Sequence, residues 1–173
     1  GPYRSSDHDP IVIGISAEGA ASETKQLNFL NVNDFHGRIA ANTVKFAGTI
    51  AGPRAAFPDS SVLLSNGDHI GASLFASSVA QDQPTLDVLN ALGLAASSVG
   101  NHEFDQGYDD LDGRVKAAAK FPYLSANVTR DGNPAVQEYE IIDVDGGKVG
   151  VRGAVPEDTS ALVSPGGIYG SSS

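Results

Sequence analysis

The sequence predicts an α/β fold built on a largely parallel sheet. Between residues 27 and 127, short apolar runs typical of buried strands alternate with segments that carry helical periodicity or helix-capping residues. Two of these runs lead into an Asp with Gly close by, and a third leads into a Gly-Asn-His block. Polar residues beyond the carboxyl ends of parallel strands are typical of a binding site in this fold class.

Each expected element has its own local signal. Gly52 and Pro53 weaken or end the first helix. Pro84 occupies the first position of the second helix, and Gly93 caps its end. The Asp145-Gly146-Gly147 turn predicts a β-hairpin. The expected strands are 27–32, 61–64, 95–99 and 123–127; the expected helices are 43–50, 84–92 and 108–120; and the hairpin joins 137–144 to 148–155.

The first 26 residues differ in composition and pattern from the rest of the chain. Residues 5–10 form a polar turn, and residues 11–15 are a β-branched run that indicates a buried strand. Residues 16–26 are rich in Ala, Ser, Glu and Gly and indicate a flexible connector. A strand followed by a linker predicts the last strand of one domain, 1–15, joined through 16–26 to the first strand of another.

Composition restricts the possible functions. The chain has 173 residues, of which 40% are apolar, enough for one domain-sized core. The absence of cysteine excludes disulfides, thiolate–zinc sites and thiol nucleophiles. A net charge of −10 argues against a general nucleic-acid-binding surface and is consistent with a secreted protein whose acidic groups attract cations. No apolar run approaches the roughly 20 residues that span a bilayer, so no membrane span is expected.

Two short motifs offer metal ligands. Asp34 and His36 are two residues apart, so in an extended chain both side chains point the same way and can meet one cation. Asp68 follows Gly67 after the second apolar run, and its two carboxylate oxygens can bridge two cations. Taken alone, each motif also fits an ordinary surface or turn residue. Arg38, next to the first motif, either binds a substrate phosphate or is a solvated or carboxylate-paired arginine.

The block from Gly100 to Asp105 is the most specific motif. Asn101 offers an amide oxygen to a hard cation, and His102 can protonate a leaving-group oxygen. Asp105, three residues on, can orient that imidazole and stabilise its charge. Glu103 is expected to be structural. A chain with loops of this kind in series can bind a metal pair suited to the cleavage of phosphate esters.

At these residues the chain resembles the calcineurin-like metallophosphoesterases, and specifically their 5′-nucleotidase branch. Residues 30–38, 65–68 and 100–105 resemble the branch's three motifs, and 123–127 resembles the strand after its third helix. The resemblance implies that 27–173 is the N-terminal portion of an incomplete four-layer αββα sandwich with two divalent ions, which could be Mn, Zn, Mg or Ca. It further implies that the metal ligands are Asp34, His36, Asp68 and Asn101, with Asp68 bridging the two ions. His102 and Asp105 would form the catalytic dyad.

Residues 4–10 resemble the closing motif of endonuclease/exonuclease/phosphatase nucleases, in which Asp7 would orient and His8 would contact phosphate or act as a base. Fusions of such a nuclease to a 5′-nucleotidase are known among large secreted bacterial nucleases. The resemblance therefore implies that 1–15 is the tail of a nuclease-type domain, and that the partners are a nucleotide substrate and the remainder of the parent polypeptide.

One departure from the family pattern concerns the ligand count. The chain has no histidine after His102, although the family takes further metal ligands from later loops. Four ligand side chains for two ions predict weak binding and impaired catalysis. The leading hypothesis is therefore a metal-dependent phosphohydrolase of nucleotides, impaired in this chain. The alternatives are a non-catalytic structural or assembly fragment, which could self-associate through open sheet edges, and a calcium-stabilised binding module.

Overall fold

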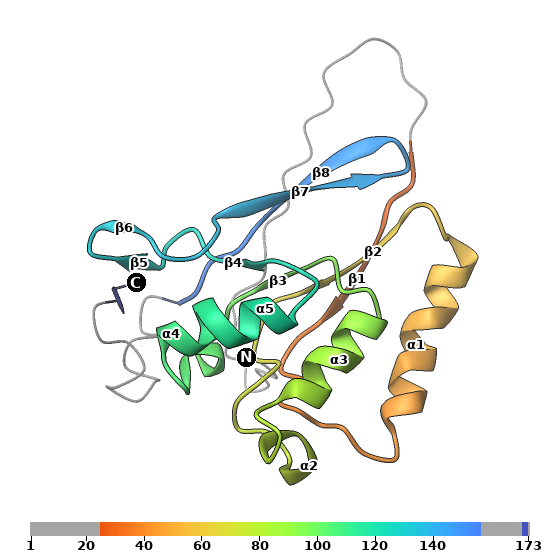
Figure 1. Cartoon of the computed structure of the whole chain (residues 1–173). Coiled ribbons are helices and arrows are strands. Elements are labelled where there is room, and N and C mark those ends of the chain that lie inside the picture. The colour runs from red at the N-terminus through yellow and green to blue at the C-terminus, as the bar shows by residue number, and fades with distance from the viewer. Residues whose placement is uncertain (1–24, 157–170, 173) are drawn as a thin grey trace, which may run out of the picture.

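The computed structural model describes residues 25–156 and the backbone of Ser171–Ser172. The expected nuclease-type segment 1–15, with Asp7 and His8, and most of the linker 16–26 lie outside these residues. In the described part, a central sheet carries helices on one side and a hairpin on the other (Figure 1). Among the described residues, no helix combines the length and the apolar character that crossing a membrane requires.

The central sheet has four parallel strands in the order β1-β2-β3-β4. They are β1 (Asn28–Val32), β2 (Ser61–Ser65), β3 (Ala96–Ser98) and β4 (Tyr123–Leu124). The longest pairing joins β1 to β2, from Asn28 opposite Ser61 to Val32 opposite Ser65. All four expected strands are confirmed, although β3 and β4 are shorter than the apolar runs that predicted them. Because the strands are parallel, the loops that follow β1, β2 and β3 leave the same edge of the sheet.

The helices connect successive strands. They are α1 (Thr43–Ala56), α2 (Phe75–Ser78), α3 (Gln83–Ala91), the short 3₁₀ turn η1 (His102–Phe104), α4 (Tyr108–Asp110), the π-helical segment η2 (Leu111–Val115) and α5 (Lys116–Ala118). The expected helix 108–120 is thus one run whose middle turn is a π-helix. The expected hairpin is confirmed as β7 (Tyr139–Val144) and β8 (Gly147–Arg152). A small antiparallel sheet adds β5 (Thr129–Arg130), β6 (Asn133–Pro134) and β9 (Ser171–Ser172).

The expected end of the first helix at residue 50 is wrong: Gly52 and Pro53 do not end α1, which continues to Ala56. Pro53 removes the N–H that would donate to the carbonyl group of Thr49, so the last turn of α1 forms with one backbone hydrogen bond fewer. Arg54 fastens this turn by donating to the carbonyl groups of Leu92 and Gly93 at the end of α3. Tertiary contacts therefore stabilise a turn that local propensity alone disfavours.

Alternation along β2 divides the core into two parts. Leu63 is fully buried and packs in the cluster that contains Leu86 and Leu89 of α3 and Val115 of η2. Val62 and Leu64 point to the opposite face, where they pack with hairpin residues Val144, Val149 and Val151. The described residues thus form a helix layer, a parallel sheet and a β-hairpin layer. This is an α/β fold with a parallel four-stranded sheet.

Candidate metal centre

The loops after β1 and β2 are joined by their backbones. Three N–H groups of the first loop donate to carbonyl groups of the second: Asp34 to Gly67 at 3.1 Å, His36 to Asp68 at 3.0 Å and Gly37 to His69 at 2.9 Å. These bonds link the two loops beyond the point where β1 and β2 end. They bring the first two sequence motifs side by side at the carboxyl edge of the sheet.

The conformation of these loops differs from the expected extended chain. Asp34, His36 and Asp68 all have positive φ angles, 55°, 45° and 53° respectively. The left-handed region costs about 1–3 kcal/mol for a residue other than glycine, although Asp and His adopt it more readily than most. The backbone bonds between the loops hold this strained conformation. The expectation of extended chain at Asp34 and His36 is therefore wrong, because both residues have a left-handed backbone.

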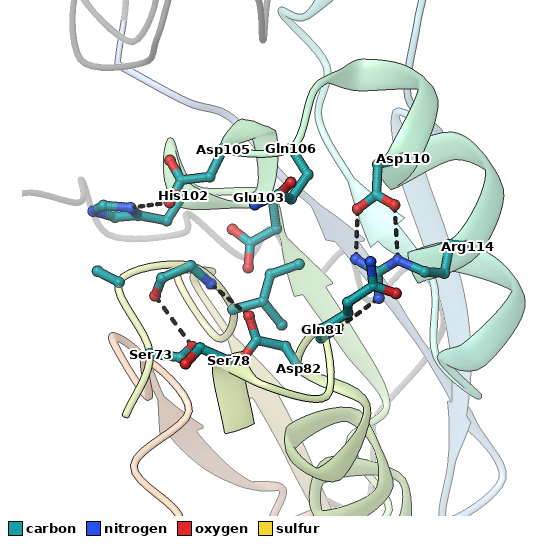
Figure 2. Close-up of a pocket in the computed structure, with 13 residues that line it drawn as sticks. Ser73, Ser78, Gln81, Asp82, His102, Glu103, Asp105, Gln106, Asp110 and Arg114 are labelled. Carbon is teal, nitrogen blue, oxygen red and sulfur yellow. Dashed lines mark hydrogen bonds and ion pairs between the residues drawn. The ribbon is translucent and has the colours of Figure 1, made fainter. Parts of the chain in front are cut away.

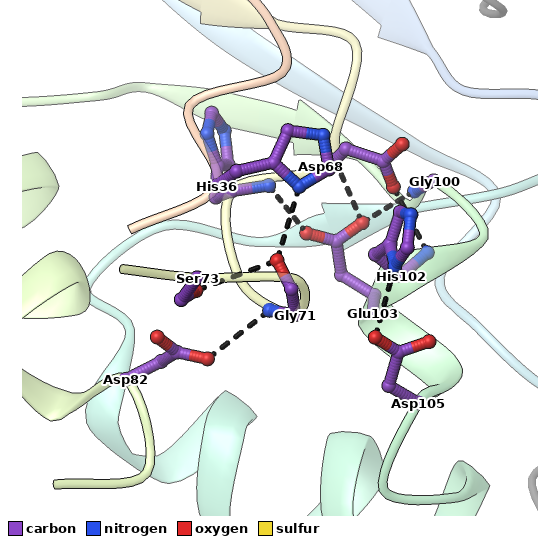
Figure 3. A network of polar contacts seen from close by, with 10 residues as sticks. His36, Asp68, Gly71, Ser73, Asp82, Gly100, His102, Glu103 and Asp105 are labelled. Carbon is purple, nitrogen blue, oxygen red and sulfur yellow. Dashed lines mark hydrogen bonds and ion pairs between the residues drawn. The ribbon is translucent and has the colours of Figure 1, made fainter. Parts of the chain in front are cut away.

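Glu103 connects the second loop to the third. Its buried carboxylate accepts hydrogen bonds from the backbone N–H groups of Asp68, His69 and Gly100, at 2.9, 2.9 and 2.6 Å. Burial and the charge of Asp68 raise the pKa of Glu103 to about 7, although the three N–H donors act in the opposite direction. Its contacts are those of a structural residue, as the sequence predicts (Figure 3).

Gly67 allows the loops to approach this closely. At φ +102°, a Cβ on Gly67 would lie 2.4 Å from the backbone nitrogen of Gly100 and 2.8 Å from the carbonyl carbon of Val99. Both the φ angle and the contact exclude a side chain here. Gly67 therefore permits the second loop to lie directly against the end of β3.

Three side chains from the three loops offer donor atoms to one position. A ligand atom from each of His36, Asp68 and His102 lies within 4.8 Å of the others. The two imidazole rings meet edge to face with centroids 4.9 Å apart. His36 Nδ1 lies 3.0 Å from the carbonyl oxygen of Gly71, which can only accept, so Nδ1 carries a proton and, in the neutral ring, Nε2 is the nitrogen with the lone pair. An O/N donor set of this kind fits a divalent cation.

His102 also contacts Asp105, its expected partner. The distance from His102 Nδ1 to Asp105 Oδ2 is 2.9 Å, and both side chains are about 30% exposed. Partial burial acts to lower the pKa of His102, but the hydrogen bond and charge of Asp105 and the charges of Asp68 and Glu103 outweigh it and raise the pKa above 6.5. The backbone N–H of His102 donates to Asp68 Oδ1 at 2.9 Å, which ties the third loop to the second.

The remaining predicted site residues lie around this group. Asn101 is buried next to His102 and starts η1. Asp34 and the exposed Arg38 line a separate cavity of about 420 Å³ beside α1. His102 and Asp105 line another cavity, of about 240 Å³, which extends toward η2 (Figure 2). Arg38 is thus near Asp34 and does not line the cavity at the His102–Asp105 pair. The roles of these residues stay predictions.

Two residues beside the site, Gly71 and Asp82, are not among those that the sequence predicts. Gly71 accepts from His36, and Asp82 accepts from the backbone N–H of Gly71 at 3.1 Å. Asp82 lies two residues before Pro84, a pattern typical of a helix N-cap. Its side chain makes no such cap. No local signal distinguishes an aspartate that caps its own helix from one that turns toward another loop.

The fold and the site together define an α/β protein with a candidate metal centre at its strand tips, and comparisons with known proteins extend this assignment. The chain is 30% identical over 183 residues to endonuclease YhcR of Bacillus subtilis, a match that covers 86% of this chain and 15% of the relative. It is 35% identical over 160 residues to a 5′-nucleotidase of Vibrio vulnificus, covering 86% of this chain and 28% of the relative. No family model matches the chain.

The fold matches solved structures as well. The calcineurin-like phosphoesterase YfkN of Bacillus subtilis superposes with a TM-score of 0.64 and 27% identity, over 79% of this chain and 50% of that one. The chain is therefore a relative of the calcineurin-like metallophosphoesterases of the 5′-nucleotidase family, which are hydrolases, and it matches part of their length. It spans less than a third of either relative named above.

Proposed function

We propose that this chain is the N-terminal portion of a metal-dependent phosphoester hydrolase that acts on nucleotides. The observation that carries the proposal is the meeting of His36, Asp68 and His102 within 4.8 Å, with Asp105 bound to the far nitrogen of His102. The relationship to 5′-nucleotidases supports nucleotides as the substrate class. Three loops from successive strands thus place metal ligands and an acid–base pair at one edge of the sheet.

The donor set suits a divalent cation such as Mn, Zn, Mg or Ca. Asp34, His36, Asp68 and Asn101 would hold two such ions, with Asp68 contributing to both. When bound, the metal pair supplies charge neutralisation at the phosphoryl oxygens and activates water for attack. With no histidine after His102, the chain provides few donors for two ions. We therefore propose that this chain alone is an impaired catalyst.

His102 has two possible roles, and they require different protonation states. As a general acid it would give a proton from Nε2 to the leaving oxygen, with Asp105 holding Nδ1. As a metal ligand it would use the unprotonated Nε2, as its place in the group of three allows. In the metal-free chain the hydrogen bond and charge of Asp105 help to outweigh burial and raise the pKa of His102, which supports the acid role.

Two single substitutions separate these roles. His36→Ala should lower the affinity of the chain for Mn²⁺ at least about tenfold, because it removes a ligand. His102→Ala should leave that affinity nearly unchanged, and isothermal titration calorimetry measures both. An equal loss in the two variants would make His102 a ligand and remove it from the acid role.

The activity test uses the longer polypeptide proposed here, with a nucleoside monophosphate as substrate. His102→Ala should reduce phosphate release by roughly 10²–10⁴-fold, the usual contribution of a positioned proton donor. His69→Ala is unsuitable as a control because that side chain is fully buried. The exposed Asp87 of α3 provides one, and Asp87→Ala should retain activity. Unchanged turnover in His102→Ala would refute the assigned dyad.

The N-terminal residues belong to the same proposal. Asp7 and His8 would be the remnant of a nuclease active site, and the parent would be a secreted nuclease–nucleotidase fusion. The relationship to endonuclease YhcR supports this arrangement. Mass determination of the protein from culture medium and from cells tests it, because a secreted fusion should appear in the medium at several times this chain's 17.8 kDa.

A non-catalytic assembly role is the second candidate, and exposed apolar side chains favour it. Tyr139 and Ile141 of β7 are 57% and 50% exposed, and Phe29 of the edge strand β1 is 37% exposed. Within residues 25–156 the outer edge of β1 pairs with no strand, and this edge and the apolar hairpin face favour pairing with another chain or another part of the parent. Sedimentation of the chain over a concentration series distinguishes the candidates, since assembly predicts a growing mass without metal-dependent phosphatase activity.

A further inference from the structure

Gly71 lies between the two histidines of the candidate metal centre. Its carbonyl oxygen accepts the Nδ1 proton of His36 at 3.0 Å. Its Cα packs against the other pair, since a Cβ built on Gly71, at φ +75°, would lie 2.4 Å from Asp105 Oδ2 and 2.9 Å from His102 Cβ. Any shift of this one peptide therefore changes the orientation of His36 and the space beside His102.

Asp82 holds that peptide in place. Its Oδ2 accepts the backbone N–H of Gly71 at 3.1 Å, and its Oδ1 accepts the hydroxyl proton of Ser77 at 2.6 Å. Ser77 is fully buried and lies 2.7 Å from the hydroxyl oxygen of Thr85. Figure 3 shows the carboxylate of Asp82 aimed at Gly71 from the side opposite His36. Both oxygens of Asp82 are thus engaged in the support of the loop.

The backbone at Asp82 is strained and is itself held from outside. Gln81 and Asp82 have φ angles of 51° and 60°. The guanidinium of Arg114 donates to the carbonyl oxygen of Gln81 at 2.6 Å and binds both carboxylate oxygens of Asp110 (Figure 2). Arg114 lies in the π-helical segment η2, and π-turns are frequent at functional sites. Strain at Asp82 is therefore maintained by a contact from another helix.

A helix-capping role does not account for Asp82. It occupies the N-cap position of α3 but makes no side-chain bond to that helix. Asparagine and aspartate adopt the left-handed region more readily than other residues with a side chain, so the conformation alone is compatible with either. What the carboxylate adds is a charged acceptor for the Gly71 N–H, which is stronger than a neutral one.

We propose that Asp82 is a positioning residue for the metal centre: through the Gly71 peptide it fixes the Nδ1–H tautomer and the orientation of His36, so that Nε2 faces the cation. The consequence for metal binding depends on the proposed function, in which His36 is a ligand. The consequence for the tautomer does not. Groups that orient a metal-bound histidine typically contribute about 10–100-fold to affinity, and Asp82 acts one step further away.

The test compares four variants of the chain, all metal-free at first. Asp82→Ala removes the carboxylate and worsens the backbone strain, whereas Asp82→Gly removes the carboxylate and relieves it. Asp82→Asn keeps an oxygen for Gly71 and an N–H₂ group for Ser77. Asp87→Ala, at an exposed position of the same helix, is the matched control. The ¹⁵N shifts of the His36 imidazole report its tautomer, and titration with Mn²⁺ then reports affinity.

Asp82→Ala and Asp82→Gly should both convert His36 to a mixture of tautomers and weaken Mn²⁺ binding by about tenfold. Asp87→Ala should match the unsubstituted chain in tautomer and affinity, and Asp82→Asn, whose oxygen is a neutral and weaker acceptor, should lie between that chain and Asp82→Ala. A retained Nδ1–H tautomer in both Asp82→Ala and Asp82→Gly would overturn the inference. A tautomer change without a loss of affinity supports the positioning role and instead overturns His36 as a ligand, so the two proposals fail separately.

Discussion

The loop after β3 and the loop after β1 both deliver a histidine to the same position, but they are built differently. In the block from Gly100 to Asp105, His102 binds a carboxylate three residues away, and the turn η1 places both side chains. In the first loop, His36 takes its partner from Gly71, 35 residues away, which is held in turn by Asp82. One site is local in sequence, and the other is assembled from distant segments.

The difference determines which residues are sensitive to change. A local pair keeps its geometry as long as its own turn forms, whereas a distant pair depends on every contact that holds the two segments together. The loops are joined by backbone bonds, by Glu103 and by the close approach at Gly67. Substitutions that break the bonds between the first two loops should therefore disturb His36 more than the His102–Asp105 pair.

Glu103→Ala should have the largest effect on stability. It leaves three buried N–H groups without their acceptor, and each unsatisfied group costs about 1–3 kcal/mol. We expect a loss of at least about 3 kcal/mol in the free energy of unfolding at pH 6, measured by urea denaturation. Glu103→Gln keeps one of the two acceptor oxygens, so its free energy of unfolding should lie between those of the unsubstituted chain and Glu103→Ala.

The pH dependence gives this prediction a second check. Glu103 has a folded-state pKa of about 7, raised from 4.5, so its contribution to stability is complete below pH 4.5 and declines as pH rises through 7. The difference between the unsubstituted chain and Glu103→Ala should therefore shrink from pH 5 to pH 8. If the stability difference instead grew with pH, the N–H donors would outweigh desolvation in their effect on the pKa of Glu103.

Gly67→Ala should have the next largest effect. The φ angle of 102° alone costs about 1–3 kcal/mol for alanine, and the Cβ contact with Gly100 adds to it. Gly48→Ala is the matched control, because Gly48 lies inside α1 with open space around it and should gain about 0.5–1 kcal/mol. Thermal unfolding of both variants measures the contrast, and a neutral Gly67→Ala would mean that the second loop can move away from β3.

The four strands, the hairpin and the loops that carry the candidate ligands could be predicted from the sequence because each depends on short-range patterns. The apolar run before Asp68 predicts a strand, and Pro84 and Gly93 predict a helix between them, without knowledge of which segments pack nearby. The i,i+3 spacing of His102 and Asp105 is equally local, and the two side chains do meet.

Other features of the fold and the site could not be predicted from the sequence, because contacts with distant residues override local conformational preference. α1 continues past Pro53 because Arg54 binds the end of α3, and Asp34 and His36 leave extended chain because their backbones bond to the second loop. Asp82 looks like a helix cap, and only the fold shows that its acceptor oxygen serves Gly71. Each of these features depends on a residue more than ten positions away.

Asp105→Asn should have the smallest effect, confined to the local pair. Its loss of charge should lower the pKa of His102, because Asp105 provides the largest of the contributions that raise it. A histidine whose pKa is raised on folding adds stability that is complete below its ordinary 6.5 and disappears as pH rises through the folded value. The variant should therefore be less stable than the unsubstituted chain near pH 5.5 and equal to it near pH 9.

Nuclear magnetic resonance titration of the metal-free chain measures the pKa of His102 directly. In the same titration Asp82→Ala should leave the pKa of His102 unchanged, since Asp82 acts on His36. If Asp82→Ala shifted the His102 pKa as much as Asp105→Asn does, the two histidines would form one coupled unit. The local His102–Asp105 pair would then be no more independent than the distant His36–Gly71 pair.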